Sequence, residues 1–112
     1  MRRSQVIELP ELRPVVLEVW AYAARCGACG TRTVAEVPPG FEPGRTFGPR
    51  IEALLGYLHH GHHLSHERLV ALAESVFGVH ISEGAVAAAL ARLAERAKPE
   101  VAAIREAVRR AR

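Results

Sequence analysis

The residues best suited to chemistry are two cysteines, Cys26 and Cys29, in the run CGACG at positions 26–30. Two thiolates separated by two residues can hold one edge of a tetrahedral zinc ion, and the glycine after each cysteine gives the loop backbone freedom. Zinc takes four ligands in a structural site, however, and the chain has only these two cysteines. The spacing therefore predicts half of a zinc site, and a pair of reduced, unliganded cysteines in a turn is the alternative.

Five of the six histidines lie within residues 59–66. His59 and His63 are four residues apart, a spacing that could bind a metal on a continuous helix, but Gly61 between them argues against such a helix. A histidine-rich tract of this kind is more typical of a solvated, partly protonated surface. The alternative is that these histidines supply the zinc ligands that the two cysteines lack.

The acidic residues are twelve glutamates, and the sequence contains no aspartate. Nucleases and transposases that hold two metal ions need clustered carboxylates, normally including aspartate. We therefore expect that this chain is not, by itself, such an enzyme. Its net charge of +3, with fourteen arginines among fifteen cations, favours a phosphate-bearing partner.

The sequence carries no signal for a membrane or for secretion. No apolar run approaches the ~18 residues that cross a bilayer, and the first residues, MRRSQVIELPEL, lack the apolar centre of a signal peptide. Two cysteines in a C-x-x-C pair do not form a disulfide framework. We expect a cytoplasmic protein without a membrane partner.

The elements that would position these residues fall into three parts. Residues 1–37 predict a β-hairpin with the C-x-x-C half zinc knuckle at its tip, because PVVLEVWAYAARC alternates with period two and TRTVAEVP is a second strand candidate. Residues 38–48 are rich in proline and glycine and predict a linker. Residues 49–112 predict a helical domain. The fold class is therefore α+β.

Within the helical domain, residues 65–97 predict a helix-turn-helix. Ser65 and Ser82 are placed as N-caps of its two helices, and Gly78 stands where a left-handed residue ends the first. An ordinary helical hairpin in a bundle is the alternative. A helix starting at Pro49 precedes this unit, and Pro99 either kinks the last helix or starts a fourth. The apolar positions expected to be buried are Ile51, Leu54, Leu55, Leu58, Leu69, Leu72, Ala73, Val76, Val86, Leu90, Leu93 and Ala97.

The helical domain also carries the candidate DNA-binding residues. We expect the first turn after Ser82 to approach a groove of the duplex while arginines contact phosphates. Alanines follow Ser82 where donors for base edges would be needed, so phosphate contact is expected more than a sharp base code. A solvated helix face is the alternative for the arginines. The candidates are Arg68, Arg92, Arg96, Arg105 and Arg109.

Several spaced motifs resemble insertion sequence 66 transposases. They are VIELP at 6–10, the cysteine pair, FGP at 47–49, YLH at 57–59, and the turn from Phe77-Gly78 to Ile81-Ser82-Glu83-Gly84. The resemblance implies a zinc-binding region, a helical DNA-binding segment and then a catalytic domain with an Asp-Asp-Glu metal site. The family's second C-x-x-C would lie before Met1 and its catalytic domain after Arg112.

The resemblance and the residues together predict a non-catalytic DNA-binding portion of such a transposase. It would position itself on the double-stranded DNA ends of the element, with zinc as the cofactor implied by the incomplete site at Cys26 and Cys29. Two alternatives stay open. The long apolar seam from Val86 to Val108 could pair with a second copy or with a full-length transposase, or the chain could be a decayed remnant without DNA affinity.

Overall fold

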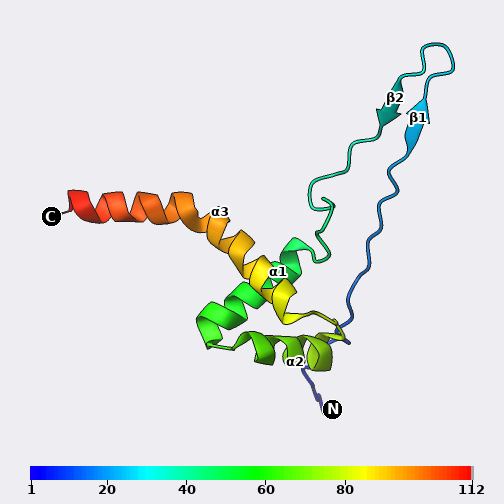
Figure 1. The fold of residues 1–112 in the computed structure, drawn as a ribbon. Helices are drawn as coiled ribbons and strands as arrows, with labels where there is room; N and C mark the ends of the chain where they lie inside the picture. Colours follow the sequence, from blue (N-terminus) through cyan, green and yellow to red (C-terminus); the bar gives the residue numbers. More distant parts are fainter. Residues whose placement is uncertain (112) are drawn as a thin grey trace.

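The computed structural model describes residues 1–111. A two-stranded arm extends from a compact helical unit, and the last helix projects from that unit in another direction (Figure 1). The predicted α+β class is confirmed. The elements in chain order are β1 (Ala23–Arg25), β2 (Arg32–Val34), α1 (Pro49–Gly56), the π-helical turn η1 (Tyr57–Gly61), α2 (His66–Phe77) and α3 (Glu83–Arg110).

The arm is an antiparallel hairpin in which Ala23 pairs with Val34 and Arg25 with Arg32. The strand expected from Pro14 onward was too long, since β1 begins only at Ala23. Continuing the observed register would bring Val19 and the residue before it opposite Pro38 and Pro39, which have no N–H to donate. The period-two pattern therefore continues without a partner strand.

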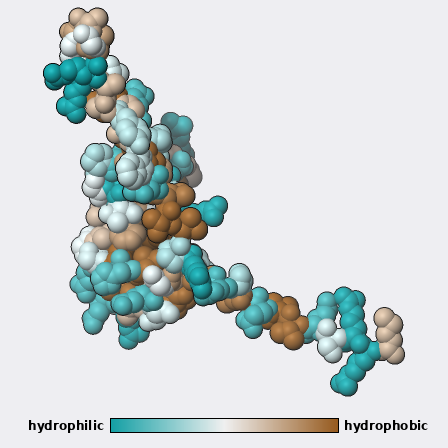
Figure 2. Space-filling view, turned by 90° about the vertical axis from the view of Figure 1, so that its right-hand side faces the viewer, coloured by the Kyte–Doolittle hydropathy of each residue, from teal (hydrophilic) through white to brown (hydrophobic). Residues whose placement is uncertain are grey.

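The unpaired part of the arm leaves large apolar side chains in solvent. Trp20 is 70 % exposed and Leu17 is 73 % exposed. Figure 2 shows apolar surface, in brown, gathered where the arm meets the helical unit. The arm consequently contributes little to the core, which lies entirely among the helices.

Helix α1 begins at Pro49, whose fixed φ suits a first helical position, with Gly48 as its N-cap. The helix then widens into η1, and the chain leaves it at His63, which has a φ of 57°. Gly61 therefore lies inside a helical turn, where the sequence had argued for a break. At Gly56 a Cβ would stand 2.6 Å from Leu93 Cδ1, so this glycine lets α1 and α3 approach closely.

The predicted caps of α2 and α3 are confirmed. Ser65 Oγ accepts from the Arg68 N–H at 3.3 Å, and Ser82 Oγ accepts from the Ala85 N–H at 3.1 Å. Gly78 is left-handed, with a φ of 64°. The N–H of the next residue donates to Ala73 O at 3.0 Å, which closes the end of α2. A five-residue turn, 78–82, thus separates the two helices.

Helix α3 runs unbroken through Pro99, so a separate fourth helix does not form there and the helical unit has three α-helices in the described part of the chain. Proline removes one intrahelical hydrogen bond without necessarily ending the helix. Figure 1 shows the helix axis changing direction between its yellow and red parts. Of the two alternatives predicted at Pro99, the structure shows the kinked, continuous helix. Within residues 1–111, no helix is both long and apolar enough to cross a bilayer.

The core is small and confined to the helical unit. Two residues expected in it are exposed instead: Val76, at 49 %, and Ala97. Ala97 lies beyond Leu93, the last half-buried residue of α3, so the apolar pattern of this helix continues past the contacts that would bury it. Leu54, Leu58, Leu72, Leu90 and Leu93 are half-buried. The fully buried apolar residues are Leu55, Leu69, Ala73, Ile81, Val86 and Ala89.

The turn geometry predicts opposite effects for two neighbouring glycines. Gly78→Ala should lower the free energy of unfolding by about 1 kcal/mol, because a Cβ is strained at positive φ. Gly84→Ala should raise it by a few tenths, because alanine is the better helix former and the site has room. Urea denaturation followed by circular dichroism measures both. Equal effects of the two substitutions would contradict the assigned turn.

Candidate nucleic-acid interface

The N-terminus of α3 lies open to solvent at the surface. Ser82, Glu83 and Gly84 are all exposed, and the Ser82 cap satisfies only one of the first backbone N–H groups. The free amides and the helix dipole make such an end attractive to a phosphate oxygen. Glu83 in the same turn opposes this attraction with its own charge. The net result is an end that can approach DNA with modest electrostatic gain.

Two of the predicted arginines are free in this part of the molecule. Arg68 lies in the first turn of α2 and Arg96 on α3, and both residues are exposed. Neither forms an ion pair among the described residues. Their guanidinium groups are therefore available for an external anion such as a phosphate.

Arg92 lies in a different environment from the one that the sequence suggested. Its NH2 group is 2.7 Å from Glu52 Oε1 and its Nε donates to the same oxygen at 2.8 Å. Glu52 comes from α1, forty positions earlier in the chain. Arg92 is thus a packing residue that joins α3 to α1, and this contact limits its freedom to reach a phosphate.

Glu52 is the buried charge that sequence reasoning missed. It is 1 % exposed, and its second oxygen accepts from Arg45 at 3.4 Å. Arg45 lies in the segment expected to be a linker, and the nearby Phe47 also packs against the core. The end of that segment is therefore anchored on the helical unit. The signal in the sequence was the position of Glu52, beside apolar residues on the buried side of α1.

Arg105 and Arg109 do not extend the surface formed by Arg96. Nine residues separate Arg96 from Arg105 along one helix, which places the two side chains about 180° apart around its axis. Both distal arginines lie on the projecting half of α3 and are exposed. The candidate cations thus form two separate groups, and a single contact on one face of α3 cannot use all of them.

The face of α3 that follows Ser82 is short of polar groups. Ala87, Ala88 and Ala91 are exposed and supply no donor or acceptor for a base edge. Methyl groups of this kind can contact thymine methyls, which is weak and degenerate recognition. The structure thus keeps small side chains at the positions where a recognition helix would read bases.

The two cysteines lie in the hairpin loop, as predicted, and both are free and exposed. The loop closes through hydrogen bonds from Cys26 N–H to Thr31 O and from Gly30 N–H to Cys26 O. The Cys29 thiol lies 3.0 Å from Thr31 Oγ1, and hydrogen bonds from Thr31 to the thiolate lower the pKa of Cys29 to about 7. This favours the thiolate, the form that binds metals.

Within residues 1–111 no third histidine, cysteine or acidic side chain joins the cysteines as a metal cluster. The two thiols therefore fit half of a tetrahedral site and no more. The histidine tract lies elsewhere, at the end of η1. There His59 Nδ1 is 2.7 Å from Leu64 O, and its ring lies 5.2 Å from that of His66. His59 thus packs on the backbone of its own turn, while His60, His62 and His63 are exposed.

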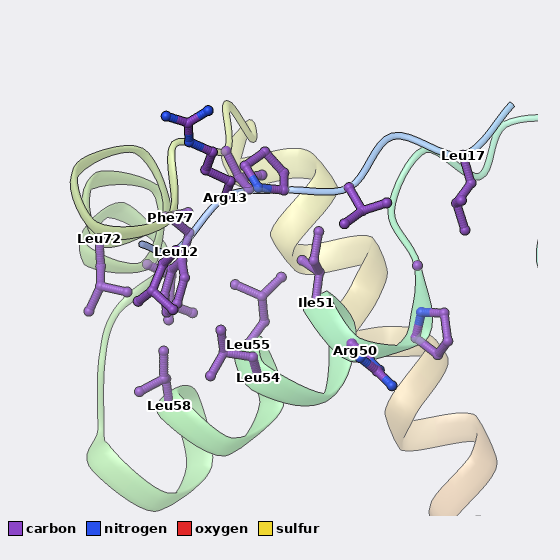
Figure 3. A pocket seen from close by; sticks show the side chains of 17 residues that line it. Leu12, Arg13, Leu17, Arg50, Ile51, Leu54, Leu55, Leu58, Leu72 and Phe77 are labelled. Atoms are coloured by element: carbon purple, nitrogen blue, oxygen red, sulfur yellow. The ribbon is translucent and has the colours of Figure 1, made fainter. Parts of the chain in front are cut away.

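An apolar cavity of about 600 Å³ lies between α1, α2 and the segment 12–17. Figure 3 shows Leu54, Leu58, Leu72 and Phe77 around it, with Leu12 among these apolar side chains. Apart from Arg13 and Arg50, its lining is apolar. Such a lining can hold an apolar side chain or segment but does not offer the groups needed for acid–base or nucleophilic chemistry.

Comparison with known proteins gives one result. The family model described as "Transposase IS66 family" matches residues 44–112. This range begins beside Arg45, where the chain starts to pack on the helical unit, so it contains the whole core. No curated protein and no solved structure matches the chain significantly.

Because of the contacts of Glu52, we predict that substituting Arg92 or Arg96, which lie one helical turn apart, has different effects on the stability of the fold. Arg92→Ala should lower the free energy of unfolding by about 1–2 kcal/mol, because it leaves a buried carboxylate with one partner; partial exposure of Arg92 reduces the loss. Arg96→Ala, the matched control, should change it by less than about 0.5 kcal/mol. Thermal or urea unfolding tests this, and equal values for the two variants would exclude a structural role for Arg92.

Proposed function

The chain belongs to the IS66 transposase family, and from this premise we propose that its helical unit is a non-catalytic DNA-binding portion that positions a transposase on the ends of its element. The family membership makes DNA the natural partner. The observation that carries the proposal is the exposed start of α3 beside α2, with unpaired arginines on both helices. The proposal assigns positioning, and no bond-breaking step, to these residues.

In this proposal α2, the turn 78–82 and α3 act as a helix-turn-helix. The first turn of α3 approaches the groove, while Arg68 at the start of α2 contacts the phosphate backbone, as the first helix of such motifs does. Arg96 adds a second phosphate contact farther along α3. Arg92 is not used, because it holds Glu52.

The exposed alanines support backbone and shape recognition over a base code. Phosphate contacts fix where a protein sits on a duplex but carry no sequence information themselves. A domain with few base contacts therefore distinguishes its target only weakly, and further specificity at the DNA ends would come from other contacts of the transposase. We propose that this unit supplies affinity and orientation.

Salt dependence of binding to a fluorescein-labelled duplex, measured by anisotropy, tests the proposal. The affinity should fall linearly on a log–log salt plot, and Arg68→Ala or Arg96→Ala should each reduce the slope by about 1 because each removes one phosphate contact. Lys98→Ala is the matched control. It removes the same charge from α3, but the ammonium of Lys98 is already paired with Glu95.

Three outcomes of that titration are informative. Slopes that fall for the two arginine variants but not for the lysine control support the assigned face. Absence of binding by the folded chain at low salt would contradict DNA recognition altogether. Binding that all three variants leave unchanged would place the DNA on another surface.

We also propose that Cys26 and Cys29 form half of a zinc site that is completed by ligands outside this chain's hairpin. Two thiolates alone should hold zinc weakly. Zinc should slow alkylation of both thiols by iodoacetamide, because a metal-bound thiolate is a poor nucleophile, and a chelator should restore the rate. Alkylation that is indifferent to zinc would contradict this half site.

A further inference from the structure

The projecting half of α3 carries an apolar stripe that nothing in residues 1–111 covers. Val101, Ile104 and Val108 recur at intervals of three and four residues and are 42 %, 62 % and 55 % exposed. They continue the side of α3 that is buried at Val86 and Ala89. Since α3 itself projects from the helical unit (Figure 1), this stripe continues beyond the core that would bury it.

This stripe has the heptad spacing of a coiled-coil seam. With Val101 assigned to position a, every a and d position of the projecting half is apolar. The seam residues are Ala94, Val101 and Val108 at a, and Ala97, Ile104 and Ala111 at d. Pro99 falls at the outward-facing position f, where a missing backbone N–H does not disturb the seam.

The charges beside the seam indicate the partner and its direction. Glu100 occupies position g and Arg105 the e position five residues later, so in a parallel pair of identical helices each Glu100 faces the partner's Arg105. An antiparallel pair centred on Ile104 would bring each Arg105 close to the partner's Arg105, where like charges repel. The sequence of one helix is therefore complementary to a parallel copy of itself.

The other charged side chains of this half of α3 do not occupy a or d positions of the seam. Glu106 pairs with Arg110 within the helix, at positions f and c, and Lys98 pairs with Glu95. Arg109 lies at position b, away from the seam. Arg105, a candidate DNA-binding residue, lies at the edge of the apolar stripe.

We propose that the projecting half of α3 pairs with a second copy of this chain as a parallel two-stranded coiled coil, with Val101, Ile104 and Val108 in the interface and Glu100 paired to the partner's Arg105. Each copy would cover the apolar stripe of the other. Parallel pairing also places both helical units at the same end of the coiled coil. This inference does not depend on DNA binding.

Sedimentation equilibrium of the full chain over a wide concentration range tests the pairing. The wild-type chain should form a dimer, and Ile104→Arg should raise its dissociation constant by at least about a hundredfold, because two apolar side chains leave the interface and two charges enter it. Ala103→Arg, the matched control at the outward position c, should leave the dimer intact. Circular dichroism verifies that both variants stay helical.

Charge reversal tests the direction. Glu100→Arg and Arg105→Glu should each weaken the parallel dimer by roughly threefold to tenfold, since each creates two like-charge contacts, and the double variant should restore the wild-type affinity. Arg105→Ala distinguishes the two directions. In a parallel pair it removes the attraction to the partner's Glu100 and weakens the dimer, whereas in an antiparallel pair it relieves the repulsion between the two Arg105 side chains and strengthens the dimer.

The outcomes that overturn the proposal are distinct. A wild-type chain that stays monomeric at the highest concentration excludes a second copy as the occupant of the stripe. A trimer excludes the two-stranded form, and a dimer that is insensitive to Ile104→Arg places the interface elsewhere. A dimer strengthened by Arg105→Ala excludes the parallel direction.

Discussion

The helical unit depends on one buried carboxylate. Glu52 contacts Arg92 from α3 on one oxygen and Arg45 on the other, so α1, α3 and the segment before α1 meet at one charge. A buried acid of this kind is costly without partners and is tolerated when both oxygens are satisfied. The core around it has only six fully buried apolar residues. In so small a core, an ion-pair network that fixes how α1 lies across α3 has a large share in defining the fold.

How much the sequence predicted depends on how far apart the interacting residues lie. The caps at Ser65 and Ser82 and the left-handed Gly78 were predictable, because each interacts with residues a few positions away. The length of β1 was not predictable from its own residues, because a strand extends only as far as the opposite strand can offer backbone N–H groups for hydrogen bonds. The Arg92–Glu52 pair spans forty positions, and nothing local to Arg92 distinguishes it from Arg96.

The candidate site was likewise predicted only in part. The position of the cysteines in a hairpin loop followed from their flanking glycines and the two strand-like segments. The arginines were found as a set, but their division into separate groups depends on helix rotation and on partners in other elements. Arg92 is held in the fold, Arg96 faces solvent, and Arg105 borders the apolar stripe. Residue type indicated the chemistry, whereas packing determined which residues are free for it.

The exposed alanines of α3 have a consequence for how this fold can change over evolutionary time. Ala87, Ala88 and Ala91 fill no part of the core and hold no cap or ion pair among the described residues. Long polar residues such as arginine or glutamine are also good helix formers, so they could replace these alanines at little cost in stability. The residues that maintain the fold are thus separate from these exposed positions of α3, so substitutions there can change the surface of α3 over evolutionary time without destabilising the fold.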